Sequence, residues 1–169
     1  MLSKKMLTAL NDQVNAELHS AYIYLSMAAY FAEENLPGMA AWMTLQESEE
    51  RVHAMKFYHY IIERRGRVTL QAVEAPPATW DSPLAAFEAA LEHEQYISGR
   101  IHTLVKLAKE EGDYPTESFL KWFVDEQVEE EDNVGSVVDD LKRAEGYPPA
   151  LFMLDRELGA RQAEPAAAE

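Results

Sequence analysis

Residues 46–53 read QESEERVH, and this segment contains two neighbouring carboxylates and an imidazole. Glu50 and His53 are three residues apart, so a helix would present them on one face, with Glu49 beside them. Carboxylate oxygens and an imidazole nitrogen suit iron or manganese and do not suit copper(I) or a structural zinc ion. The pattern therefore predicts a metal site if other segments bring further carboxylates to the same place.

Four long segments with apolar residues at steps of three and four would have to position these groups. The predicted helices cover about 5–34, 39–65, 83–112 and, after Tyr114-Pro115-Thr116, up to about 144. Gly66 follows the second helix and is the expected cap, and Ser82 before Pro83 is the expected start of the third. A short fifth helix is expected at about 148–158, after two prolines.

The connection at roughly 67–82, VTLQAVEAPPATWDS, is too long for a hairpin loop and has no helical pattern. About sixteen extended residues span up to about 50 Å, whereas a helix of about 28 residues is about 42 Å long. The connection can thus run the length of a bundle and leave helices two and three parallel. We therefore expect an all-α fold, a four-helix bundle with one long crossover and a short fifth C-terminal helix.

Polar residues interrupt the apolar face of every long helix. On the first helix, whose stripe includes Tyr24 and Leu25, the interruption is Glu17. The others are Gln46, Glu49, Glu50 and His53 on the second helix, Glu94 on the third, and Gln127 and Glu130 on the fourth. Each lies within about one turn of the middle of its helix, so the interruptions should meet at one level of the bundle.

Buried carboxylates that meet in a core repel one another and require either protons or cations. No Lys or Arg is expected to project from these levels, so metal ions are the predicted compensation. A lone Glu on an apolar stripe is more often a solvated edge, and a structural helical protein without metal is the alternative. Four coincident cases at one depth favour the metal site.

The length and composition of the chain limit its domain organisation and exclude several classes of function. Its 169 residues suggest one domain, residues 1–160, followed by a flexible tail at 161–169. The absence of Cys excludes thiolate sites and suits a cytoplasmic location. A net charge of -15 argues against nucleic-acid binding, and no apolar run is long enough for a signal peptide or a membrane span.

A second acidic feature is VDEQVEEED at 124–132, where Glu126 and Glu129 fall on the flank of the fourth helix. Such runs are usually solvated faces. Because Glu49 is displaced in the same direction on the second helix, the run could instead form a third, more exposed cation site.

The chain resembles bacterial non-haem ferritin over residues 1 to about 160. The segments that carry this resemblance are NAELHSAYIYL, ESEERVH, LEHEQ and DYPTESFLKWFVDEQVEEE, together with the long crossover and the fifth helix. The resemblance implies a homo-oligomeric shell of 24 subunits that oxidises Fe(II) with dioxygen or peroxide at a di-iron centre and stores hydrated ferric oxide. Exposed apolar residues in the fifth helix, Leu151, Phe152 and Leu154, would support oligomerisation.

Site roles follow from the same resemblance. It implies that Glu17, Glu50 and His53 hold one iron, and that the second is held by Glu50 as a bridge, Glu94 and Glu130, with Gln127 close by. The implied third iron site consists of Glu49, Glu126, Glu129 and the shared Glu130. Tyr24 and Trp122 match aromatic residues beside the centre, although both could serve in packing alone.

Several residues distinguish the chain from related ferritin-like families. The fourth helix has Gln127-x-x-Glu130 in place of Glu-x-x-His, and Arg51 stands where bacterioferritins have the methionine that binds haem, so no haem is expected. A rubrerythrin-like peroxidase would need a Cys-ligated iron. A DNA-protecting mini-ferritin would place its iron ligands between subunits, whereas here all four helices of one chain contribute.

Overall fold

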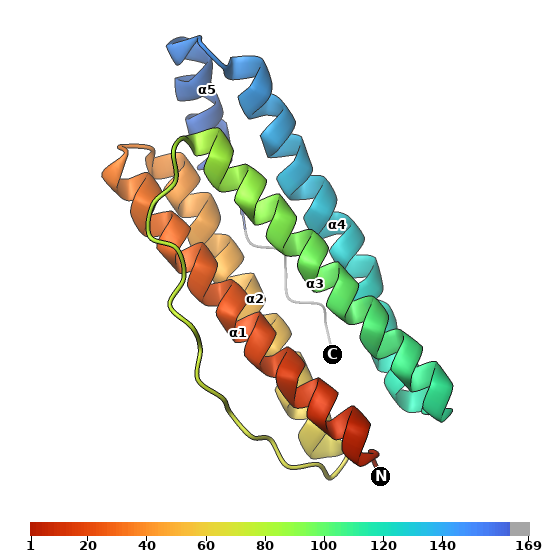
Figure 1. Ribbon diagram of the computed structural model, residues 1–169. Helices are drawn as coiled ribbons and strands as arrows, with labels where there is room; N and C mark the ends of the chain where they lie inside the picture. The colour runs from red at the N-terminus through yellow and green to blue at the C-terminus, as the bar shows by residue number, and fades with distance from the viewer. Residues whose placement is uncertain (163–169) are drawn as a thin grey trace.

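A computed structural model of the chain describes residues 1–162 and shows five helices in these residues. Their bounds are α1 Lys4–Glu33, α2 Pro37–Glu63, α3 Pro83–Glu111, α4 Tyr114–Ala144 and α5 Pro148–Leu158. Four long helices lie side by side as a bundle, and α5 lies at one end (Figure 1). The all-α four-helix fold with a fifth C-terminal helix is thereby confirmed. No helix in the described part is long and apolar enough to cross a membrane.

The helix boundaries follow from side-chain caps. The side chains of Ser3, Ser82 and Asp113 accept hydrogen bonds from the backbone N–H three residues later, and so begin α1, α3 and α4. The fourth helix therefore starts at Tyr114, earlier than expected, because Asp113 caps it and Pro115 fits the first turn.

The end of α2 differs from the sequence-based expectation. Arg65, and not Gly66, has the left-handed backbone conformation, with φ 58°. The N–H groups of Arg65 and Gly66 donate to the carbonyls of Ile62 and Ile61, a Schellman arrangement. Gly66 packs closely for another reason, because a Cβ there would lie 2.8 Å from the end of the Leu7 side chain, which would have to shift.

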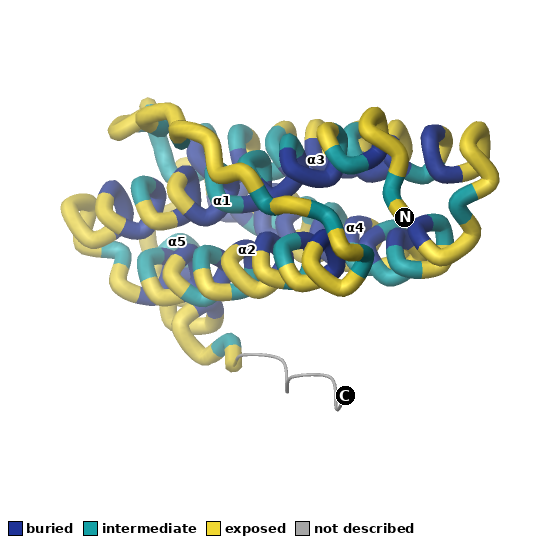
Figure 2. The backbone as a smooth tube through the Cα atoms, turned by 90° about the horizontal axis from the view of Figure 1, so that it is seen from below, coloured by how far each residue is buried: buried dark blue, intermediate teal, exposed yellow. Residues whose placement is uncertain are grey.

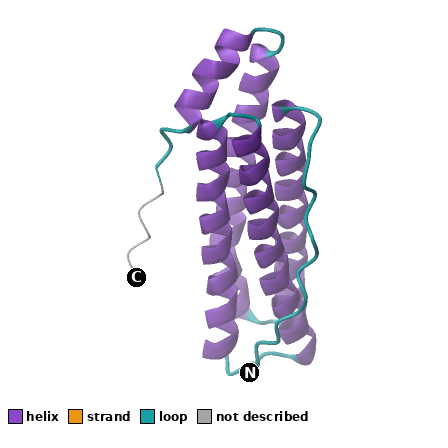
Figure 3. Cartoon of the chain, turned by 90° about the vertical axis from the view of Figure 1, so that its left-hand side faces the viewer, coloured by secondary structure: helices purple, strands orange, loops and turns teal. Residues whose placement is uncertain are grey.

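The crossover between α2 and α3 runs along the whole bundle (Figures 1 and 3), so these two helices are parallel as expected. It is held against α1 by hydrogen bonds from both polar groups of Asn11. The Asn11 amide donates to the carbonyl of Arg67 at 3.1 Å, and its oxygen accepts from the N–H of Thr69 at 2.7 Å. Farther along, the Ser26 hydroxyl donates to the carbonyl of Pro77 at 2.6 Å.

Buried residues follow the inward faces of the four long helices (Figure 2). The apolar part of this core forms two separate clusters, one around Phe31, Trp42 and Phe87 and the other around Phe57 and Ile101. A bundle with four continuous apolar stripes would give one uninterrupted core. The gap between the clusters is the level at which the polar residues were expected to meet.

Two expectations about individual apolar residues were wrong. Leu25 was placed on the buried stripe of α1, but its exposed fraction is 48%. Leu154 was expected to be exposed, but it is buried because α5 folds back against α2 and α4 and joins the first apolar cluster. Leu151 is partly buried in the same place, and Phe152 is exposed.

Gly38 and Asp155 fix the position of α5. The Asp155 carboxylate accepts a hydrogen bond from the N–H of Met39 at 2.9 Å and so caps the first turn of α2. A Cβ at Gly38 would lie 1.6 Å from the carbonyl oxygen of Asp155, so only glycine allows the two backbones to approach this closely. The contact directs the residues after α5 toward the middle of α2.

Candidate metal centre

Polar residues from all four long helices are buried between the two apolar clusters, and six of them, each at most 4% exposed, form a belt of candidate metal ligands and their neighbours. They are Glu17 on α1, Glu50 and His53 on α2, Glu94 on α3, and Gln127 and Glu130 on α4. These residues are therefore buried near the middle of the bundle, at the level that the sequence predicted for them. Such a belt in an apolar core is costly unless its members are paired, protonated or bound to cations.

His53 belongs to two groups of potential metal ligands. In one group, ligand atoms of Glu17, Glu50 and His53 all lie within 4.8 Å of one another, and in the other, so do those of His53, Glu126 and Glu130. The Nδ1 atom of His53 is 3.6 Å from a Glu50 oxygen, and its Nε2 atom is 3.5 Å from a Glu126 oxygen. The imidazole thus stands between the two sets of carboxylates.

Glu94 lies outside both three-ligand groups and is held by hydrogen bonds. The Tyr24 hydroxyl donates a short hydrogen bond to its Oε1 atom. The Gln127 amide donates to its Oε2 atom at 3.1 Å and approaches the Ser98 hydroxyl at 3.4 Å. Tyr24 and Gln127 therefore hold the Glu94 carboxylate from both sides within the belt.

Two carboxylate oxygens in the belt, Glu17 Oε2 and Glu50 Oε1, are buried without a hydrogen-bond partner among the described residues. Buried polar atoms are nearly always satisfied, and an exception calls for an explanation. Glu17 and Glu50 both belong to the same three-ligand group. A proton or a bound cation would satisfy these oxygens.

Burial raises the pKa of Glu17 and Glu94 and raises that of Glu50 well above its usual range. Burial and the neighbouring Glu94 raise the pKa of Glu130 from 4.5 to about 8. Burial alone would lower the pKa of His53, but its contacts with Glu126 and Glu50 outweigh this effect and raise it well above 6.5. Without metal the belt therefore retains protons near neutral pH, and a cation that binds there must displace them.

Residues expected at a third site are only partly brought together. Glu126 approaches His53 and Glu130, whereas Glu129 is exposed and belongs to no three-ligand group among the described residues. The Glu49 carboxylate is 2.8 Å from the guanidinium of Arg161.

The expectation that no Arg would project to this level was wrong, for two reasons. Arg161 reaches the belt from beyond α5, and Arg100 reaches it through Gln13. Arg100 Nε donates to the Gln13 oxygen at 2.9 Å, and the Gln13 amide donates to Glu17 Oε1 at 2.8 Å. Gln13 could have been found from the sequence, because it lies one helical turn before Glu17 on the same face.

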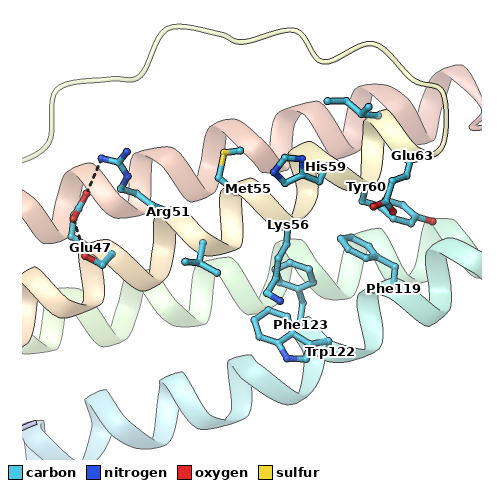
Figure 4. Close-up of a pocket in the computed structure, with 13 residues that line it drawn as sticks. Glu47, Arg51, Met55, Lys56, His59, Tyr60, Glu63, Phe119, Trp122 and Phe123 are labelled. Atoms are coloured by element: carbon cyan, nitrogen blue, oxygen red, sulfur yellow. Dashed lines mark hydrogen bonds and ion pairs between the residues drawn. The ribbon is translucent and has the colours of Figure 1, made fainter. Parts of the chain in front are cut away.

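Trp122 lies beside the centre, with its ring centroid 5.4 Å from that of His53. The Lys56 ammonium is also close to the indole, 4.3 Å from the ring centroid (Figure 4). Trp122 and Lys56 border a pocket of about 970 Å³ along α2 and α4. This pocket extends from the Glu47–Arg51 ion pair to Tyr60. Trp122 and Phe123 both line this pocket and contact the His53 ring.

A ferritin-like domain model matches residues 7–144, which comprise nearly all of the four-helix bundle. The chain belongs to the ferritin family. It is 42% identical over 161 residues to a bacterial non-heme ferritin of Staphylococcus aureus, with 95% of this chain and 97% of the relative covered. It is 41% identical over 161 residues to a bacterial non-heme ferritin of Bacteroides fragilis, with 95% of this chain and 100% of that relative covered.

Solved structures support the same assignment. An open-pore ferritin from Archaeoglobus fulgidus is 51% identical to this chain and superposes with a TM-score of 0.95 over 96% of this chain and 100% of the other. A closed form of that ferritin, engineered by mutagenesis, has the same TM-score and identity over 97% of this chain. Ferritins are iron-storage proteins, and the buried belt of carboxylates is the part of this fold that is suited to iron.

Proposed function

We propose that this chain is an iron-storage subunit that oxidises Fe(II) with dioxygen at the buried belt. In this proposal Glu17, Glu50 and His53 bind one iron, and Glu50, Glu94 and Glu130 bind the second, with Gln127 beside it. The observation that carries the proposal is that Glu17 Oε2 and Glu50 Oε1 have no hydrogen-bond partner among the described residues, although both residues are buried members of one group of three potential ligands. Hard oxygen donors with one imidazole suit Fe(II) and Fe(III).

The chain's own residues would prepare the reaction in three ways. Burial keeps the carboxyls protonated until Fe(II) replaces the protons, so the empty core avoids the repulsion of several charges. Gln13 occupies one oxygen of Glu17 and leaves the other for the ion. Two ferrous ions held together each supply one electron to dioxygen, and the ionised carboxylates then stabilise the ferric charge.

Storage requires an enclosed volume, and a single chain does not provide one. We propose that the chains assemble as a closed homo-oligomer of 24 subunits that holds the ferric product as hydrated oxide, in the cytoplasm. The similarity to the open-pore ferritin of A. fulgidus and to its closed form supports assembly into a shell. The net charge of -15 favours cations near the protein surface.

The test is an anaerobic Fe(II) titration of the metal-free protein, followed by admission of air while ferric absorbance and particle size are recorded. Fast oxidation of about two irons per chain and slower uptake beyond that ratio in a large particle is the expected result. Glu17→Ala and Glu94→Ala should each slow the first phase by at least roughly 10-fold, because loss of a residue that only supports a metal ligand already costs about 10- to 100-fold. Glu110→Ala removes an exposed carboxylate from α3 and serves as the control.

Unchanged initial oxidation in both Glu17→Ala and Glu94→Ala would contradict the assignment of the centre. Saturation at about two irons in a small particle would retain the centre and remove the storage function.

A further inference from the structure

Arg161 lies three residues after the end of α5, and its guanidinium makes three contacts on α2. One nitrogen donates to the Gln46 oxygen at 2.8 Å, and another donates to Glu49 Oε2, also at 2.8 Å. The guanidinium carbon lies 4.8 Å from the centroid of the Trp42 ring. Both Arg161 and Glu49 side chains are about four-fifths buried, at 20% and 21% exposed.

The contact with Gln46 continues into the belt. Because the Gln46 oxygen accepts from Arg161, its amide nitrogen faces the other way and donates to Glu130 Oε2 at 2.5 Å. A reversed amide would place its NH₂ group against the guanidinium, where two donors would meet. Arg161 therefore fixes the orientation of Gln46, and Gln46 holds the Glu130 carboxylate.

The contact with Glu49 places a fixed positive charge where a third cation would have to bind. A guanidinium stays charged at any pH that the fold tolerates, and its planar fork matches a carboxylate. A metal ion cannot use the Glu49 oxygen that Arg161 holds without displacing the guanidinium from Gln46 and Trp42 as well. The Arg161 guanidinium would thus compete directly with a metal ion at Glu49.

We propose that Arg161 is a built-in cation that positions Gln46 and Glu130 and limits binding of a third metal ion at Glu49, so that this ion binds fully only when the Arg161 guanidinium is displaced. The proposal rests on the proposed function, because it treats Glu49 as a ligand outside the di-iron pair. It predicts that cation stoichiometry depends on a residue that does not ligate metal.

The test uses the full-length assembled protein and Tb³⁺, a hard, redox-inert cation that prefers carboxylate oxygens and emits when an indole nearby absorbs light. Trp42 adjoins Arg161, so Tb³⁺ bound at Glu49 would lie close to an indole. Titrations of the native protein, Arg161→Gln and Arg161→Lys would give the number of ions per chain and their dissociation constants. Arg156→Gln removes an exposed charge of the same kind from α5 and is the matched control.

Arg161→Gln should tighten the Glu49-dependent binding of Tb³⁺ roughly fivefold, which corresponds to about 1 kcal/mol, the upper end of the scale for one partly exposed ion pair. Arg161→Lys and Arg156→Gln should stay within about twofold of the native protein. The gain should vanish in Arg161→Gln combined with Glu49→Gln. An unchanged affinity in Arg161→Gln, or an equal gain in Arg156→Gln, would overturn the proposal.

Failure of the proposed function has a different signature. Anaerobic Fe(II) binding by the same variants would then show no pair of ions that depends on Glu17, whatever the effect of Arg161 on Tb³⁺. If the pair is present and Arg161→Gln leaves Tb³⁺ binding unchanged, the centre stands and the role of Arg161 does not.

Discussion

Replacement of Glu130 by Gln is expected to stabilise the metal-free protein by an amount that grows with pH. The Glu130 carboxyl is 4% exposed, and burial together with Glu94 raises its pKa from 4.5 to about 8. Below about pH 4.5 the carboxyl is protonated in both the folded and the unfolded chain, so its full contribution to stability is present. As pH rises toward 8 the unfolded chain ionises freely while the folded chain resists, and that contribution is lost.

The magnitude follows from the two pKa values. Stability should fall by about 1.4 kcal/mol for each pH unit between them, or on the order of 4 kcal/mol for each subunit by pH 8, and remain constant above it. Gln at this position has no proton to lose, and its carbonyl oxygen can still accept the hydrogen bond from Gln46. The gain in Glu130→Gln should therefore be near zero at pH about 4 and largest at pH about 8.5.

Urea unfolding of chelator-treated protein, followed by circular dichroism at several pH values, would measure this difference. Both proteins must be compared at one subunit concentration, because assembly makes apparent stability depend on concentration. Glu129→Gln changes the same charge at an exposed position on α4, and its effect should stay within about 0.5 kcal/mol at every pH. A gain in Glu130→Gln that is the same at low and high pH would refute the reasoning.

Three further outcomes are expected. Gly38→Ala should lower the thermal midpoint and release α5, because the new Cβ would lie 1.6 Å from the carbonyl oxygen of Asp155. Gly99→Ala, at a position with open space, should leave the midpoint unchanged. An unchanged midpoint in Gly38→Ala would contradict the tight contact between α5 and α2. Asn11→Ala should lower the free energy of unfolding by about 1 to 3 kcal/mol and increase proteolysis of the crossover, because two of its backbone groups lose their hydrogen-bond partners. Equal protease sensitivity of the variant and the native protein would contradict this expectation. Addition of Fe(II) without oxygen to metal-free protein at pH about 7 should raise the thermal midpoint in the native chain and not in Glu17→Ala, as calorimetry would show.

Much of the fold was determined by local features of the sequence. Apolar residues that recur every three or four positions define the four long helices. The length of the segment at 67–82 requires a crossover along the bundle. The level of the belt could also be predicted, because Glu17, Glu50, Glu94 and Glu130 each lie near the middle of a helix and helices of similar length align. These inferences need only the geometry of one helix at a time.

Other features were decided only by the tertiary structure. Glu49 and Arg161 are 112 residues apart, and no periodic pattern links them. Their contact exists because Gly38 lets α5 approach α2 closely enough to direct the segment after it toward the belt. The burial of Leu154 has the same origin. A helical period shows which side chains share a face of one element, but which element covers that face depends on backbone approach and packing between elements, and these exist only in the folded chain.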